Sequence, residues 1–132
     1  MNIYLLAAAI MCVVMALGHT AIGTRWVLPR LAPGLLPATP FGPGQMTSGF
    51  IKVTWHAVGI ILVSLGGLLL LLASTHLQDG GATAVRAISL MFAAATVMVI
   101  WLSRRHPINL VRAPMWLLFV AVAVTCWLGA SG

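Results

Sequence analysis

Apolar residues run almost without interruption through four stretches of the chain, at residues 3–22, 53–73, 83–103 and 114–130. Each stretch is about 17 to 21 residues long, and about 20 helical residues cross the roughly 30 Å hydrocarbon core of a bilayer. Open strands are excluded there, because lipid offers no hydrogen-bond partner to free backbone groups. The pattern predicts an all-α integral membrane protein of one domain, residues 1–132. We expect a four-transmembrane-helix bundle with spans at about 3–24, 49–76, 83–103 and 114–130.

Composition supports this fold class. Of the 132 residues, 61% are hydrophobic and 6% are charged, and Asp79 is the only acidic residue. Such a chain has too little polar surface to cover a water-soluble globule. The net charge of +6 does not indicate nucleic-acid binding, because the basic residues lie at the ends of apolar stretches and form no clustered basic face. The lipid bilayer is therefore the expected environment.

Positive charge is distributed unevenly between the two sides of the predicted bundle. Six basic residues lie in the first and third connections, and one lies on the other side: Arg25, Arg30, Lys52, Arg104, Arg105 and Arg112 against Arg86. The positive-inside rule places both basic connections in the cytoplasm and both termini on the non-cytoplasmic side. Four tryptophans beside these connections fit this topology as interfacial rings: Trp26, Trp55, Trp101 and Trp116. In a bacterium the membrane would be the inner one.

The connections differ in character. Residues 28–47 form a Pro-rich cytoplasmic loop that cannot hold a long regular helix. Its apolar side chains predict contact with lipid headgroups or with a partner protein: Leu28, Leu31, Leu35, Leu36 and Phe41. We expect Thr47 or Ser48 to cap the second span. A tight turn at residues 78–81, with Thr83 as the next cap, makes the second and third spans antiparallel neighbours.

Two histidines lie within the predicted spans at similar depth. His19 is six residues before Arg25, about 9 Å along a helix, and His56 is four residues after Lys52, about 6 Å. Both therefore lie towards the cytoplasmic side and could meet. The first interpretation is structural, with neutral imidazoles donating hydrogen bonds to carbonyls of neighbouring spans and fixing how the helices pack.

A second interpretation makes His19 and His56 the axial ligands of a b-type haem. Glycines next to both residues would leave room for the porphyrin. The consecutive order of the two spans argues against it, since neighbouring helices would be wedged apart by the ring. Arg25 and Lys52 are the only obvious partners for the propionates.

A third interpretation is a copper site. Cys12, Met15 and His19 share one helical face at spacings of three and four residues, and they offer the thiolate, thioether and imidazole ligands that suit Cu(I). Methionine fills gaps far more often than it binds metal, and the spacing matches no copper motif known to us. The cofactor thus remains open between haem b, copper and none.

Catalysis has little support in the sequence. The only carboxylate side chain, that of Asp79, belongs to a turn, and no nucleophile elbow, phosphate loop or zinc motif is present. Small residues recur every four positions in the first span, which allows helices to approach closely: Ala8, Cys12, Ala16, Thr20 and Thr24. We therefore expect an accessory or structural subunit rather than an enzyme, and we expect it to contact other membrane subunits or a second copy of itself. The alternative is a redox protein that binds haem or copper.

Overall fold

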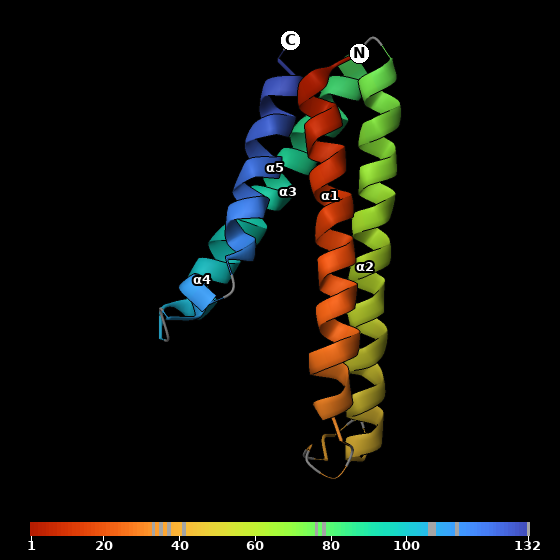
Figure 1. Ribbon diagram of the computed structural model, residues 1–132, viewed down its shortest axis with the longest axis vertical. Helices are drawn as coiled ribbons and strands as arrows, with labels where there is room; N and C mark the ends of the chain where they lie inside the picture. The colour runs from red at the N-terminus through yellow and green to blue at the C-terminus, as the bar shows by residue number, and fades with distance from the viewer. Residues whose placement is uncertain are drawn as a thin grey trace. The chain divides into compact units, whose positions relative to one another are not determined.

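The computed structural model describes the chain except for residues 33, 35, 37, 41, 76, 78, 106, 107, 113 and 132. The expectations for Leu35, Phe41 and the start of the outer turn fall outside these described residues. Seven helical segments are described (Figure 1): α1 Ile3–Ile22, the π-helical turn η1 Gly23–Val27, the 3-10 turn η2 Leu28–Arg30, α2 Gly44–Ser74, α3 Asp79–Ser103, α4 Ile108–Arg112 and α5 Met115–Gly129.

The helices confirm the all-α class and the integral membrane character. Three helical stretches are long and apolar enough to cross a bilayer: Ile3–Arg30, Gly44–Ser74 and Gly80–Ser103. The fourth apolar helix, α5, has 15 residues, about 22 Å at 1.5 Å per residue, which is shorter than the hydrocarbon core. The chain is a small multi-pass membrane protein, and a fourth crossing stays a prediction.

Two helix starts differ from the sequence expectation. α2 begins at Gly44 because the Pro43 carbonyl accepts a hydrogen bond from the Met46 N–H at 2.9 Å, as an N-cap carbonyl does. Ser48 is therefore not a cap, and its hydroxyl donates to the Leu31 carbonyl at 3.0 Å. α3 begins at Asp79, so Gly80 and Gly81 belong to its first turn and not to a preceding turn.

The chain divides into two compact units. Unit 1 comprises residues 1–13 and 65–132. Within it, α3 packs along α5 (Figure 1). The buried Ser89 hydroxyl of α3 donates to the Ala123 carbonyl of α5 at 2.7 Å, and the rings of Phe92 and Phe119 lie 5.9 Å apart. The packing of unit 1 is completed by buried apolar side chains, among them Leu5, Leu69, Val85, Val122 and Cys126.

Asn2 joins three helices at one end of unit 1. Its backbone N–H donates to the Ala73 carbonyl of α2 at 2.8 Å, and its side-chain amide donates to the Gly129 carbonyl of α5 at 2.8 Å. Its side-chain oxygen accepts hydrogen bonds from the N–H groups of Tyr4 and Leu5 and so caps α1. The start of α1 and the ends of α2 and α5 therefore meet at this end, where Figure 1 marks both termini.

Unit 2 comprises residues 14–64. It contains the second part of α1, both short turns, the Pro-rich segment and most of α2. Among its described residues between Arg30 and Gly44 no long helix forms, as the prolines predict. Gly42 has φ +139°, a conformation open to glycine, and exchanges backbone hydrogen bonds with Thr39 at 2.9 Å. Both histidines of the candidate site belong to this unit.

Candidate functional site

His19, in the last turn of α1, is joined to Trp55 of α2 by two hydrogen bonds and a ring stack. Its Nε2 lies 3.0 Å from the Trp55 carbonyl oxygen, and the indole Nε1–H donates to the His19 carbonyl at 3.1 Å. The two rings are nearly parallel, with centroids 4.3 Å apart and an interplanar angle of 10°. We call this arrangement the His19–Trp55 clasp. Since a carbonyl only accepts, Nε2 carries a proton, and in the neutral ring Nδ1 keeps its lone pair.

Gly23 makes room for the clasp. It is buried, and a Cβ added to it would fall within the indole ring of Trp55. The π-helical turn begins at this glycine. In a regular helix the His19 carbonyl accepts the N–H of residue 23, and here it accepts the indole N–H of Trp55. A side chain inserted into the backbone hydrogen-bond ladder is a known cause of helix kinks, and the π-helical turn begins four residues after this carbonyl.

His56 lies one residue beyond Trp55 and has a different environment. Its side chain is exposed and makes no hydrogen bond within the described part of the chain. It lines a groove of about 430 Å³ formed by α1 and α2 within unit 2. We call this the His56 groove, and its walls are Ala16, Leu17, Thr20, His56, Gly59, Ile60, Val63 and Ser64.

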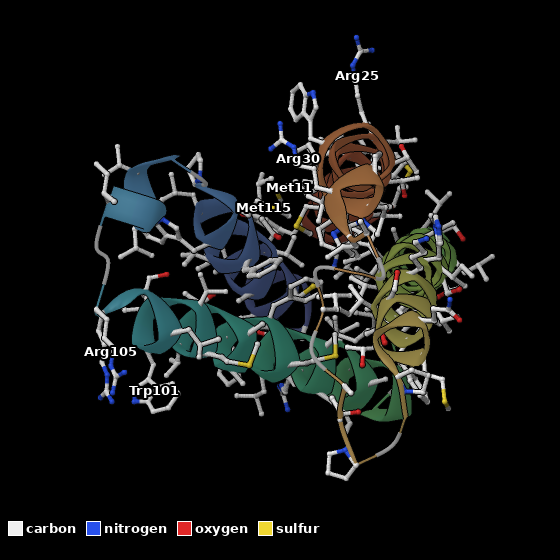
Figure 2. All side chains as sticks on the ribbon, turned by 90° about the horizontal axis from the view of Figure 1, so that it is seen from below. Met11, Arg25, Arg30, Trp101, Arg105 and Met115 are labelled. Atoms are coloured by element: carbon white, nitrogen blue, oxygen red, sulfur yellow. The ribbon has the colours of Figure 1, made fainter. Side chains whose placement is uncertain are left out.

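The two imidazoles open onto separate depressions. His19 lines a hollow of about 290 Å³ with Phe50, Ile51, Thr54, Trp55 and Val58, whereas His56 lines the His56 groove. Arg25 and Lys52, the expected partners of haem propionates, are both exposed. Figure 2 shows the Arg25 side chain pointing away from its helix.

The proposed copper ligands have unequal exposure. Cys12 and Met15 are buried, and His19 is half-buried with Nε2 engaged by Trp55. Among the described residues, no group of three His, Cys, Asp or Glu side chains is placed to hold a metal ion. The set of Cys12, Met15 and His19, which includes a thioether, therefore stays a prediction.

Sequence reasoning missed the role of Trp55. The sequence indicates an interfacial ring at Trp55, and the structure adds that this ring is the partner of His19. One signal could have indicated this. Gly23 follows His19 by four residues, so the two share a helical face, and a glycine there leaves space for a flat ring from the next helix.

No protein-family model, curated protein or solved structure matches this chain. Its function is therefore inferred from its own residues.

Proposed function

We propose that this protein is an accessory or structural subunit of a larger membrane assembly or of a homo-oligomer, and that the His56 groove is its contact surface. The observation that carries the proposal is the polar content of this groove. Thr20, His56 and Ser64 line it, and their side chains make no hydrogen bonds within the described part of the chain. Most of the surrounding exposed surface is apolar.

Polar groups on a helix face that meets lipid are unfavourable unless a partner satisfies them. The apolar stretch of α2 runs from residue 53 to residue 73. His56 is near one end of it, and Ser64 is eight residues further, about 12 Å deeper and near its middle. A neighbouring helix in the groove could form hydrogen bonds with all three polar side chains, which are exposed.

The His19–Trp55 clasp fits a structural role for His19. The imidazole proton on Nε2 is used in a bond between α1 and α2, as expected of a polar residue that fixes helix packing. The clasp holds together the two helices that form the walls of the His56 groove. Because the groove is already formed, less conformational entropy is lost when a partner binds.

We propose further that all four apolar helices cross the membrane, with the basic connections in the cytoplasm and both termini outside. Basic residues on the two sides, six against one, support this orientation. The hydrogen bonds of Asn2 to the ends of α2 and α5 also support it, since they bring those ends to the start of α1. In a bacterium, the inner membrane is the expected location.

Photo-crosslinking in native membranes tests the contact surface. A benzoyl-phenylalanine at Ile60, which is 67% exposed and lines the groove, is compared with one at Ile61, which is 53% exposed and lies outside it. Adjacent helical residues point about 100° apart at nearly the same depth. We expect a discrete protein adduct from position 60 and only lipid adducts from position 61. An adduct of twice the mass identifies a homo-oligomer, and another discrete mass identifies a heteromeric assembly.

His56→Phe provides the specificity test, because it keeps a ring in the groove and removes both nitrogens. If the groove contacts a partner through its polar side chains, this substitution should reduce the adduct at position 60 about fivefold, as expected for loss of about 1 kcal/mol of hydrogen bonding. Equal protein adducts at positions 60 and 61, or none at either, would contradict the proposal.

The second candidate function is a membrane redox protein that binds haem b or copper. The unpartnered imidazole of His56 and the free lone pair on Nδ1 of His19 support it. An absorption spectrum of the purified protein, with metal analysis of the same sample, separates the candidates. A sharp α-band on reduction that His19→Ala abolishes indicates haem, and stoichiometric copper indicates the site with Cys12 and Met15. A featureless spectrum without metal leaves the subunit role.

A further inference from the structure

We propose that the end of unit 1 where Asn2 lies is a binding site for a phosphate group, with Arg86 as its cationic ligand. A depression of about 860 Å³ opens between the start of α1, the end of α2, the start of α3 and the end of α5. Its described polar side chains are those of Arg86, Asn2 and a set of hydroxyl residues: Tyr4, Ser74, Thr75, Thr83 and Ser131. Its lining residues belong to the helix ends near which Figure 1 marks both chain termini.

Among the described residues that line this depression, Arg86 has the only cationic side chain. Within the described part of the chain its guanidinium makes no ion pair or hydrogen bond. The chain has one acidic residue against seven Lys and Arg residues, so most of its cationic side chains have no internal carboxylate partner. Arg86 lies seven residues after the first residue of α3, about 10 Å along the helix. A cation at that depth in a membrane helix requires an anionic partner or contact with the headgroup region.

Among the side chains described at this site, Arg86 provides the positive charge. Two helices begin at the depression and two end there, so their dipoles largely cancel. The hydroxyls of Ser74, Thr75 and Ser131 already donate to carbonyls of their own helices, at 2.7, 3.2 and 3.0 Å. The Tyr4 hydroxyl has no partner among the described residues. The Asn2 amide donates to the Gly129 carbonyl, and Thr83 also has a partner. Among the described side chains that line the depression, the guanidinium and this phenol are therefore the donors that remain for a ligand.

Phosphate is the anion that fits this donor set and this depth. A guanidinium offers paired N–H groups that match two phosphate oxygens, and the phenol can donate to a third. About 10 Å from its start, a spanning helix passes from the headgroup region into the hydrocarbon, so a lipid phosphate is within reach of a long side chain. Free inorganic phosphate offers the same chemistry, and an experiment has to separate the two sources.

Binding to the full-length protein in neutral detergent tests the site. Dihexanoyl-phosphatidylglycerol is titrated against the wild type and against Arg86→Gln and Arg105→Gln, with bound lipid counted by native mass spectrometry. Arg105 is the matched control, because it is exposed after the other end of α3 and does not line the depression (Figure 2). We expect Arg86→Gln to weaken binding about tenfold, the loss expected for a charge-assisted hydrogen-bond pair, and Arg105→Gln to change it less than about twofold.

Two further measurements keep the result interpretable. Arg86→Lys retains the positive charge without the paired N–H groups of the guanidinium, and it should bind the lipid with intermediate affinity. Unchanged helical circular dichroism shows that the variants fold. Displacement of the lipid by excess inorganic phosphate identifies a site for the free anion, whereas resistance to displacement identifies a lipid site. Native mass spectra that show neither lipid nor inorganic phosphate bound, or binding that Arg86→Gln and Arg105→Gln weaken equally, would overturn the proposal.

Discussion

Two helix contacts in this protein are stabilised in different ways. In unit 1, α3 and α5 meet through apolar side chains and one buried hydroxyl bond, from Ser89 to the Ala123 carbonyl. In unit 2, α1 and α2 are joined by the His19–Trp55 clasp, in which two hydrogen bonds and a ring stack come from one pair of residues. The first contact spreads its attraction over many side chains, and the second concentrates it.

The difference shows what each contact can tolerate. In lipid, helices associate through packing and hydrogen bonds, because apolar side chains gain nothing by leaving a hydrocarbon solvent. A contact that is distributed over many side chains loses little stabilising free energy when one group is removed. The clasp depends on the space above Gly23, where an added Cβ would fall within the indole ring. We therefore expect unit 2 to be much more sensitive than unit 1 to single substitutions at its helix contact.

The largest expected effect is that of Gly23→Ala. The added methyl cannot coexist with the indole, so either the Trp55 ring moves and its hydrogen bond and stack with His19 are lost, or the two helices separate. Overpacking of this kind destabilises proteins by about 1–3 kcal/mol. The free energy of unfolding is measured by circular dichroism during titration of mild-detergent micelles with dodecyl sulfate.

Gly18→Ala is the matched control on the same helix. No atom lies within 4 Å of a Cβ built on Gly18, so the substitution should be neutral or should stabilise α1 by up to about 1 kcal/mol through helix propensity. Similar destabilisation by both variants would show that Gly23 serves no special purpose at the clasp.

The sequence predicted the helices well because their physical cause is local. Apolar stretches of spanning length must become helical in lipid, and this requirement located α1, α2 and α3. Proline also acts locally, so the absence of a long helix in the described part of residues 31–43 could be predicted. The start of α2 at Gly44 was missed, since two glycines and a glutamine near it resemble a loop, although Pro43 provides the first helical carbonyl.

The clasp could not be predicted because it depends on how each helix is rotated about its axis. A soluble helix reveals its buried face by alternating polar and apolar residues, but α1 and α2 are apolar on most sides. Depth along the axis was available from Arg25 and Lys52, and it suggested that His19 and His56 could meet. Rotation instead directs His19 to Trp55, while His56, the next residue, lines the His56 groove.

A double-mutant cycle measures how far the two halves of the clasp depend on each other. His19→Phe keeps a stacking ring and removes the Nε2–H donor, whereas Trp55→Phe removes the indole donor to the His19 carbonyl. Because each change also weakens the stacking partner of the other, we expect a coupling energy of about 1 kcal/mol in the same unfolding assay. A coupling energy near zero would mean that the two hydrogen bonds act independently and that the clasp is not a unit.

The smallest expected effect is at the contact of unit 1. Ser89→Ala removes the hydroxyl donor to Ala123 and leaves a carbonyl that still accepts its own helical bond. Interhelical hydrogen bonds in membranes average about 0.6 kcal/mol, and the methyl that remains keeps the close packing of α3 on α5. Ser64→Ala is the control, because the Ser64 hydroxyl makes no hydrogen bond within the described residues and should change unfolding of the monomer by nearly nothing. If Ser89→Ala instead destabilised the protein as much as Gly23→Ala, the attraction between α3 and α5 would be concentrated in one bond, and the contrast between the two units would be wrong.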